Sequence, residues 1–165
     1  MASGDTLVVF IPQASEPPAS NYGTLDTVGT VFPHSVVDLA VGESIVFSGF
    51  MPGHYANTTG ITITSIYAMT SGIADEIELE TAIERLQDGV GDLATAGFAT
   101  ANTTGEVTVL GTAGLVDYVD STHTKGAEMD SLVANEAFRL KVTRASAASD
   151  APGDLELRMV IVKET

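Results

Sequence analysis

Histidine is the side chain best suited to proton transfer or metal binding near neutral pH, and the sequence contains three: His34, His54 and His123. No two of them stand at the short spacing that places two imidazoles on one metal ion. His54 follows Pro52-Gly53, a pair that breaks regular structure, so we assign it to a loop with a structural or interface role. The histidines therefore predict neither a catalytic base nor a metal site.

Acidic residues are more numerous, and two groups of them suggest chemical sites. Asp117, Asp120 and Asp130 lack the Asp-x-Asp-x-Asp-Gly spacing and the distal Glu of an EF-hand, which leaves a weak calcium site among loop carboxylates as the lesser alternative. The glutamates between positions 76 and 84 have the residue type of a glycosidase carboxylate set. If this segment is a strand, three of them line one solvated face, and adjacent carboxylates in water do not form an acid–base pair.

Nucleophiles and cofactor loops are missing as well. The sequence has no Cys, which excludes a thiol nucleophile, a thiolate metal site and a disulfide framework. It contains no Gly-x-Ser-x-Gly elbow, no phosphate-binding glycine loop and no dinucleotide fingerprint. We expect a protein that is not an enzyme and that uses neither a cofactor nor a metal.

Aromatic side chains offer one further chemistry, because small β-sandwiches often bind sugars on exposed rings. Tyr22, Tyr55, Tyr67 and Tyr118 fall in different segments, and the sequence has no Trp. The aromatic residues therefore do not predict a flat sugar-binding surface, and sugar binding is kept as an alternative function.

The charge balance narrows the choice of partners. The chain has 22 acidic and 7 basic residues, for a formal net charge of −15. Nucleic acid is not an expected partner, because phosphate binding needs clustered Lys and Arg. The N-terminus lacks the basic region of a secretory signal, and no apolar run reaches the ~20 residues of a membrane helix. Solubility is the simplest role for the charge, ahead of specific cation binding.

The stretch 126–144 best shows how such side chains are positioned. From Phe138 onward apolar and polar residues alternate, which is typical of a strand with one buried and one solvated face. Asn135 precedes that strand and accepts the left-handed backbone of a tight turn. Residues 38–47 repeat the phrase with Gly42 in the place of Asn135, so we expect two similar units of a turn followed by a strand.

Further strands are expected over Leu7–Pro12, Val36–Leu39, Glu43–Met51, Gly60–Thr70, Glu106–Leu110, Leu115–Val119 and Leu155–Val162. In the last of these, alternation places Met159 and Ile161 on the face of Leu155. Segment 75–87 fits both a helix and a strand, since its residues favour a helix while its apolar positions also alternate. Residues 88–104 are expected to form a long loop in which Phe98 points inward.

About eight strands separated by turn signals predict an all-β fold: an antiparallel β-sandwich, with the jelly roll as the favoured form, long loops and little helix. A chain of 165 residues fits a single domain. Within it, residues 34–165 would form the sandwich and residues 1–33 an extended N-terminal segment. This segment, which contains Pro17-Pro18, is either a simple connection or an arm laid on a neighbouring subunit.

Four segments resemble small virion structural proteins of tailed bacteriophages: the opening Met-Ala-Ser-Gly-Asp-Thr-Leu, Pro17–Thr27, Met129–Leu132 and Phe138–Arg144. The likeness is strongest at both ends and weakest over residues 88–104. Such proteins resemble capsid decoration, or cement, proteins, which in many phages are β-rich, often jelly-roll-like, and sit as trimers on the outer shell. The resemblance also favours a strand for residues 75–87, although the Glu-rich sequence there departs from the family.

The resemblance implies a head decoration protein that binds the outer capsid surface of the virion and stabilises it as a homotrimer. Its partner would be the major capsid protein, with no contact to nucleic acid or membrane. The alternatives are a tail- or fibre-associated virion structural protein and a glycan-binding β-sandwich module. The candidate contact residues are Pro12, Pro17, Pro18, Tyr22, Phe32, Phe50, Met51, His54 and Tyr55.

Overall fold

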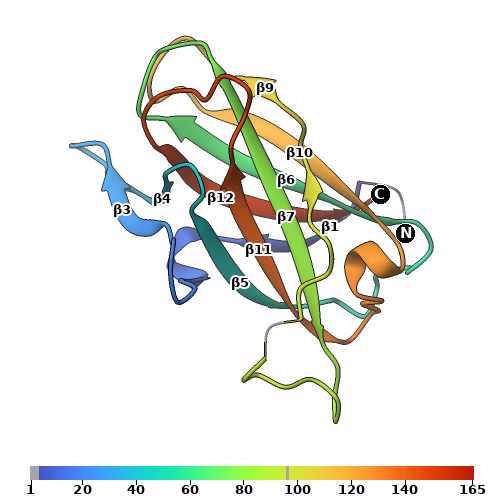
Figure 1. Cartoon of the computed structure of the whole chain (residues 1–165). Coiled ribbons are helices and arrows are strands. Elements are labelled where there is room, and N and C mark those ends of the chain that lie inside the picture. Colours follow the sequence, from blue (N-terminus) through green and yellow to red (C-terminus); the bar gives the residue numbers. More distant parts are fainter. Residues whose placement is uncertain (1–3, 96) are drawn as a thin grey trace.

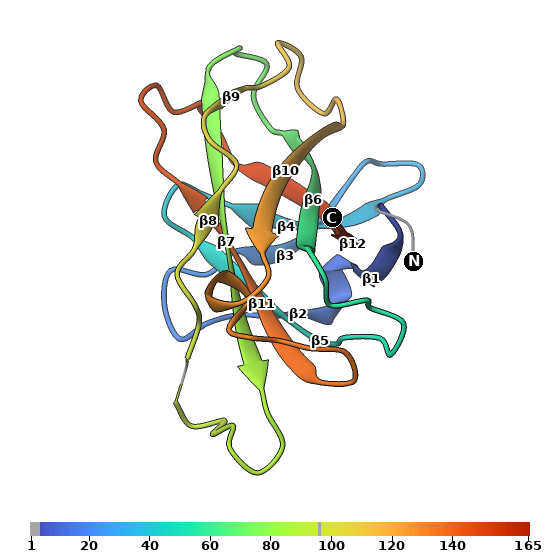
Figure 2. The same ribbon diagram turned by 90° about the vertical axis from the view of Figure 1, so that its right-hand side faces the viewer.

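Two six-stranded antiparallel sheets pack face to face in the computed structural model, which describes residues 4–95 and 97–165 (Figure 1). The first sheet has the order β10 (Asp117–Thr124), β6 (Gly60–Met69), β12 (Leu155–Glu164), β4 (His34–Leu39) and β3 (Thr24–Val28), with β1 (Thr6–Phe10) also paired to β12. The second has the order β2 (Ser15–Glu16), β5 (Ser44–Phe50), β11 (Ala137–Ala145), β7 (Glu76–Leu86) and β8 (Asn102–Thr103), with β9 (Val107–Thr108) also paired to β7. Figure 2 shows the two layers in a view turned by 90°.

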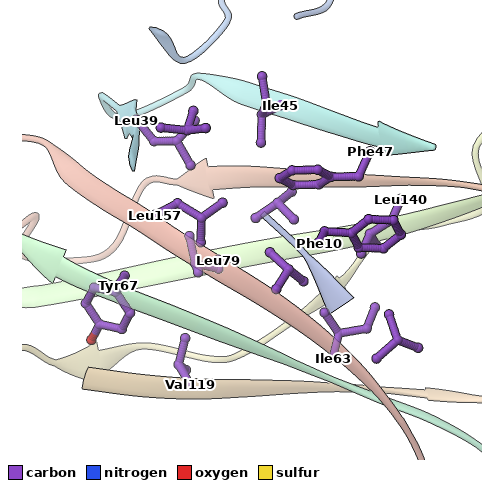
Figure 3. Close-up of a cluster of buried hydrophobic side chains, with 14 of the residues drawn as sticks. Phe10, Leu39, Ile45, Phe47, Ile63, Tyr67, Leu79, Val119, Leu140 and Leu157 are labelled. Atoms are coloured by element: carbon purple, nitrogen blue, oxygen red, sulfur yellow. The ribbon is translucent and has the colours of Figure 1, made fainter. Parts of the chain in front are cut away.

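The inward faces of both sheets build one apolar core, because their strands alternate between buried and less buried residues. Figure 3 shows buried side chains that both layers contribute to this core, among them Phe47 of β5 and Leu157 of β12. The ring of Phe10 stacks on that of Phe47 at a centroid distance of 5.2 Å and meets Phe138 edge-on at 6.1 Å. Residues 4–95 and 97–165 contain only two short 3₁₀-helices, η1 (Pro12–Ala14) and η2 (Ala127–Met129). The predicted fold class, an all-β jelly-roll sandwich, is confirmed.

Segment 75–87, expected to be a strand despite its helix propensity, forms strand β7 (Glu76–Leu86). It pairs along its length with β11, from Leu86 opposite Ala137 to Glu78 opposite Ala145. Its inward residue Leu79 is fully buried in the core. The segment forms a strand because its alternating positions bury apolar surface between two sheets. The free energy gained by this burial outweighs a modest helix propensity.

The two similar turn-and-strand units are present and lie side by side. Gly42 and Asn135 both have a left-handed backbone, with φ of 85° and 64°. In each unit the next residue, Glu43 or Glu136, accepts a hydrogen bond from the amide three residues before it, at 2.9 and 3.1 Å. The strands that follow, β5 and β11, pair antiparallel.

The first 33 residues differ from the expected N-terminal arm. β1 pairs with β12, β2 with β5, and β3 with β4, so the described part of this segment supplies strands to both sheets. The proline pair Pro17-Pro18 lies in the connection that crosses from one sheet to the other. The hairpin of β3 and β4 projects beyond the body of the sandwich in both views (Figure 1 and Figure 2).

Two side-chain directions expected from the sequence are wrong. The register of β12 shifts between Leu157 and Met159, and beyond this β-bulge Val160 and Val162 point into the core in place of Met159 and Ile161. Phe98 does not point inward. Its ring lies against the outer face of the second sheet, with the guanidinium of Arg139 5.2 Å from the ring centroid.

The alternation of side chains along β11 also places one charged side chain in the core. Arg144 is on the same face as Phe138 and is fully buried. Its guanidinium donates to the carbonyl oxygens of Leu39, Gly153 and Ala151 at 3.2, 2.6 and 2.6 Å. Burial lowers the pKa of the Arg144 guanidinium. This side chain ties β4 to the turn that leads into β12, since backbone carbonyls are suitable acceptors for a buried cation.

Candidate binding groove

A groove of about 420 Å³ crosses the outer face of the first sheet. It spans the strands from β6 through β12 and β4 to the end of β3, and the turn that precedes β10 closes its far side. Its lining residues are Val28, Gly29, His34, Val36, Tyr67, Ala68, Gly114, Val116, Glu156 and Arg158. A volume of this size is within the range of small-molecule binding sites.

The outward positions of the central strands form the floor of this groove. On β12, Leu155 and Leu157 point into the core, so Glu156 and Arg158 point outward. On β4, Val37 is fully buried in the core, and its neighbour Val36 faces the groove. The floor therefore combines aliphatic surface with one carboxylate and one guanidinium.

The chain segments that line the groove also carry exposed apolar side chains. Val116 and Tyr118, on the side of β10, are 55% and 61% exposed. On the opposite side, the β3–β4 hairpin ends in Val31 and Phe32, which are 78% and 82% exposed. Large exposed apolar groups around a concave surface are a common feature of ligand- and partner-binding sites.

Carboxylates accumulate beside the groove without a matching cation. Glu156 lies directly across from Asp38 in the pairing of β12 with β4. Burial raises the pKa of the Glu156 carboxyl, and the negative charges of Asp38, Asp26 and Asp154 raise it further. The pKa of Asp38 is raised by burial and then by Asp26, Asp154 and Glu43. Asp38 Oδ1 is buried and has no hydrogen-bond partner among the described residues.

The outer face of the second sheet is arranged differently, because Glu84 on this face is paired with Arg139. Glu84 accepts a hydrogen bond from Arg139 Nε at 2.6 Å and a second from the amide of Gly97 at 2.6 Å. A second pair lies at the end of β7, where Arg85 is opposite the buried Phe138. Glu136 accepts a hydrogen bond from Arg85 Nε at 2.6 Å, and this bond lowers the pKa of the Glu136 carboxyl. Glu84 and Glu136 are therefore already satisfied without a ligand.

A second group of polar side chains is enclosed between the sheets. Thr81 Oγ1 lies 2.6 Å from Ser121 Oγ and 2.8 Å from His123 Nε2, and His123 Nδ1 lies 3.0 Å from the carbonyl oxygen of Glu128. All three side chains are buried, at 1%, 2% and 0% exposure. Burial lowers the pKa of His123. The group cross-links β7 and β10 and has no access for a substrate.

Three of the nine candidate contact residues are buried within the chain. Met51 and Tyr55 belong to the core, where the Tyr55 hydroxyl donates to Met129 Sδ at 3.7 Å. Pro12 is buried in η1. These side chains are therefore not available to a partner.

The other six candidates, Pro17, Pro18, Tyr22, Phe32, Phe50 and His54, are exposed or half-buried and do not share one surface. Tyr22 bridges to Ser44 at the start of β5, whereas Phe50 is at the end of that strand. Tyr22 lines a shallow depression of about 250 Å³ with Leu25 and Pro17. Phe50 borders a larger hollow of about 470 Å³, beside Leu86. Their part in an interface stays a prediction.

Sequence reasoning missed the groove itself. Val116 carried a usable signal, because an exposed valine on a turn marks apolar surface that the core does not use. The pairing of β12 with β4, which brings Glu156 beside Asp38, had no signal in the sequence.

Neither a metal site nor a membrane-spanning helix is found in the described part of the chain. The described residues contain no group of three or more His, Asp or Glu side chains arranged to hold a metal ion. Within 4–95 and 97–165, there is also no helix with the length and apolar character needed to cross a membrane.

Comparison with known proteins identifies the fold but no family. No family model matches this sequence, and no curated protein sequence matches it. A carbohydrate-binding module of Cellvibrio mixtus lichenase 5A, solved with cellotriose, is similar with a TM-score of 0.51 and 11% identity, over 97% of this chain and 98% of that one. A xylan-binding domain of Paenibacillus barcinonensis is similar with a TM-score of 0.51 and 12% identity, over 99% of this chain and 96% of that one.

Two further similarities extend over less of the matched chain. A Paenibacillus cycloisomaltooligosaccharide glucanotransferase, complexed with cycloisomaltoheptaose, matches 95% of this chain with 18% of its own length, a TM-score of 0.55 and 10% identity. A chain of infectious bursal disease virus matches with a TM-score of 0.41, which is too low to carry an argument. The fold is thus a jelly-roll sandwich like that of carbohydrate-binding modules.

Proposed function

We propose that this protein is a glycan-binding β-sandwich module, not an enzyme, and that the groove on the outer face of the first sheet is its binding site. The observation that carries the proposal is the position of a groove of about 420 Å³ over the central strands of the sheet, with exposed apolar side chains in the segments that line it. The likeness in fold to modules solved with cellotriose or described as xylan-binding supports the same choice.

The chemistry of the lining suits a sugar. Pyranose rings present C–H faces that pack on aliphatic and aromatic side chains, which the exposed Val116 and Tyr118 offer. Sugar hydroxyls are both donors and acceptors, and the Glu156 carboxylate and Arg158 guanidinium match these two roles. In such a site the apolar faces contribute affinity and the charged groups fix the orientation.

The test is calorimetric titration of the full chain with oligosaccharides of defined length, including cello- and xylo-oligosaccharides. We expect Tyr118→Ala together with Val116→Ser to weaken binding at least tenfold, which corresponds to about 1.4 kcal/mol for the loss of an aromatic and an apolar contact. The matched control is Phe50→Ala, which removes an equally exposed ring from the second sheet and should leave binding unchanged. If no glycan binds, or if the control weakens binding as much as the groove variant, the proposal is wrong.

The second candidate is a virion decoration protein on the outer capsid surface, and the phage-like segments together with the exposed side chains of Phe32 and Phe50 favour it. A protein that binds only the assembled shell stabilises it by mass action, and a homotrimer that contacts several copies of the major capsid protein would add avidity. A location in the tail or a fibre is the related alternative. The charge of −15 suits a place away from packaged DNA.

This candidate is tested by mixing the protein with expanded, undecorated phage heads and measuring both binding and the melting temperature of the shell. Phe32→Ser and Phe50→Ser should each reduce binding, whereas the groove variant at Tyr118 and Val116 should not. Mass measurement in solution checks the trimer. Absence of binding to heads and a monomeric mass would reject the decoration role and leave the glycan-binding proposal untouched.

A further inference from the structure

Taking the proposed glycan-binding function as its basis, we propose that the groove selects a glycan that carries protonated amino groups, such as a polymer of glucosamine. The carboxylate of Glu156 would form the centre of the amine-binding subsite, with Asp38 beside it. The aliphatic walls would take the C–H faces of the sugar rings.

The carboxylates near the groove lie on adjacent strands of the first sheet. β12, β4 and β3 are adjacent strands, and Glu156 is paired across to Asp38, which is in turn paired across to Thr24 of β3. Asp26 is two residues beyond Thr24 on the same face of β3, so it lies diagonally from Asp38. Three neighbouring strands therefore direct carboxylates to the same side of the sheet.

The second step is that none of these carboxylates forms an ion pair with a cation among the described residues. Among the described residues, the ion pairs join Arg85 to Glu136 and Arg139 to Glu84, and all four of these side chains are on β7 or the β11 unit of the second sheet. Arg158 lines the groove but forms no ion pair with Glu156. Like charges on adjacent strands destabilise a sheet, and a cation placed between them would relieve that repulsion.

The third step concerns the class of cation. A metal ion is a poor fit, because no group of metal-ligating side chains is present among the described residues. The valines that line the groove and the methyl group of Ala68 provide apolar surface, which an ammonium group attached to a carbon ring can use and a hydrated ion cannot. Uronic acid polymers are disfavoured, because their carboxylates would face those of Glu156 and Asp38.

Two tetrasaccharides of equal length test this inference: the glucosamine tetramer and its fully N-acetylated counterpart, which has no amine charge. Both are titrated into the full chain by calorimetry at pH 6, at low and at high salt. We expect the amine form to bind about tenfold more tightly at low salt, as one partly screened charge pair predicts, and to lose that advantage in high salt. The acetylated form should change little with salt.

Variants of equal charge change show whether the groove is responsible. Glu156→Gln and Asp38→Asn keep the size of the side chain and should each reduce binding of the amine tetramer to the level of the acetylated one. The matched control is Glu16→Gln, which removes one acidic charge from the exposed strand β2 and should have no effect. Unfolding by urea confirms that each variant is folded.

The possible results separate this inference from the proposed function. Equal binding of both tetramers, or equal loss in Glu16→Gln and Glu156→Gln, overturns amine selection while a glycan-binding groove remains. Failure of these and all other glycans to bind overturns both.

Discussion

The two sheets have the same kinds of charged residues and use them in opposite ways. On the second sheet, Glu84 and Glu136 each meet an arginine, and Phe98 packs over the basic side chains of β11. On the first sheet, Glu156 and Asp38 lie across from each other with raised pKa values. One face is satisfied within the chain, and the other retains unfavourable charge at its groove. The comparison suggests that stability is concentrated on the second sheet and binding on the first.

The largest effect is expected from breaking a pair on the satisfied face. Glu84→Ala leaves the guanidinium of Arg139 and the amide of Gly97 without their acceptor, and Glu84 itself is only 4% exposed. We expect the free energy of unfolding to fall by about 2–3 kcal/mol, as is typical when one partner of a largely buried pair is removed. Urea denaturation measures this change. A loss no greater than that of an exposed acid, such as Glu16→Ala, would contradict it.

A smaller loss that depends on pH is expected at the other pair. The hydrogen bond from Arg85 lowers the pKa of Glu136 below its ordinary 4.5, so its stabilisation is present above that value and is lost as the pH falls through the folded pKa. Glu136→Gln should therefore cost about 1 kcal/mol at pH 7 and less in acid. Urea midpoints of both proteins at pH 7 and pH 3.5 check the trend. A cost that is the same at both pH values would show that the charge is not what matters.

Neutralising a carboxylate on the unsatisfied face should do the opposite. Burial and Asp26 raise the pKa of Asp38 above its ordinary 3.8, so its contribution is favourable below that value and is lost as the pH rises through the folded pKa. Asp38→Asn should raise stability by about 0.5–1 kcal/mol at pH 7, as expected for relief of a like-charge cross-strand pair, and by less near pH 4. Thermal unfolding at the two pH values measures the difference. A destabilised Asp38→Asn protein would remove the contrast between the faces.

An effect no larger than that of Asp38→Asn is expected from the aromatic ring on the second sheet. Arg139 and Lys141 both lie with their charged atoms 5.2 Å from the centroid of Phe98. Phe98→Leu keeps apolar contact and removes the ring, and we expect a loss of about 0.5–1 kcal/mol. Double-mutant cycles with Lys141→Met isolate the ring–cation contribution. A coupling energy of zero would mean that Phe98 acts only through packing.

Much of the sandwich could be predicted because its rules are local. The alternation of β11 and the left-handed turns at Gly42 and Asn135 are written in short stretches of sequence, and the structure confirms them. Other features depend on partners far along the chain. β7 is a strand because β11 lies beside it, and the bulge in β12 moves Val160 into the core. Neither the pairing of β7 with β11 nor the bulge in β12 can be read from the sequence of the segment alone.

The sequence by itself determined that this protein is an acidic, cysteine-free all-β sandwich with no motif for catalysis, since composition and period-2 patterning are properties of the chain alone. Only the tertiary structure decided which side chains share a surface. It buried Met51 and Tyr55, which the sequence had offered as contacts, and it placed Glu156 beside Asp38 from positions more than a hundred residues apart. The physical reason is that strand pairing joins residues by register, and register between distant strands is fixed by the packing of the whole core.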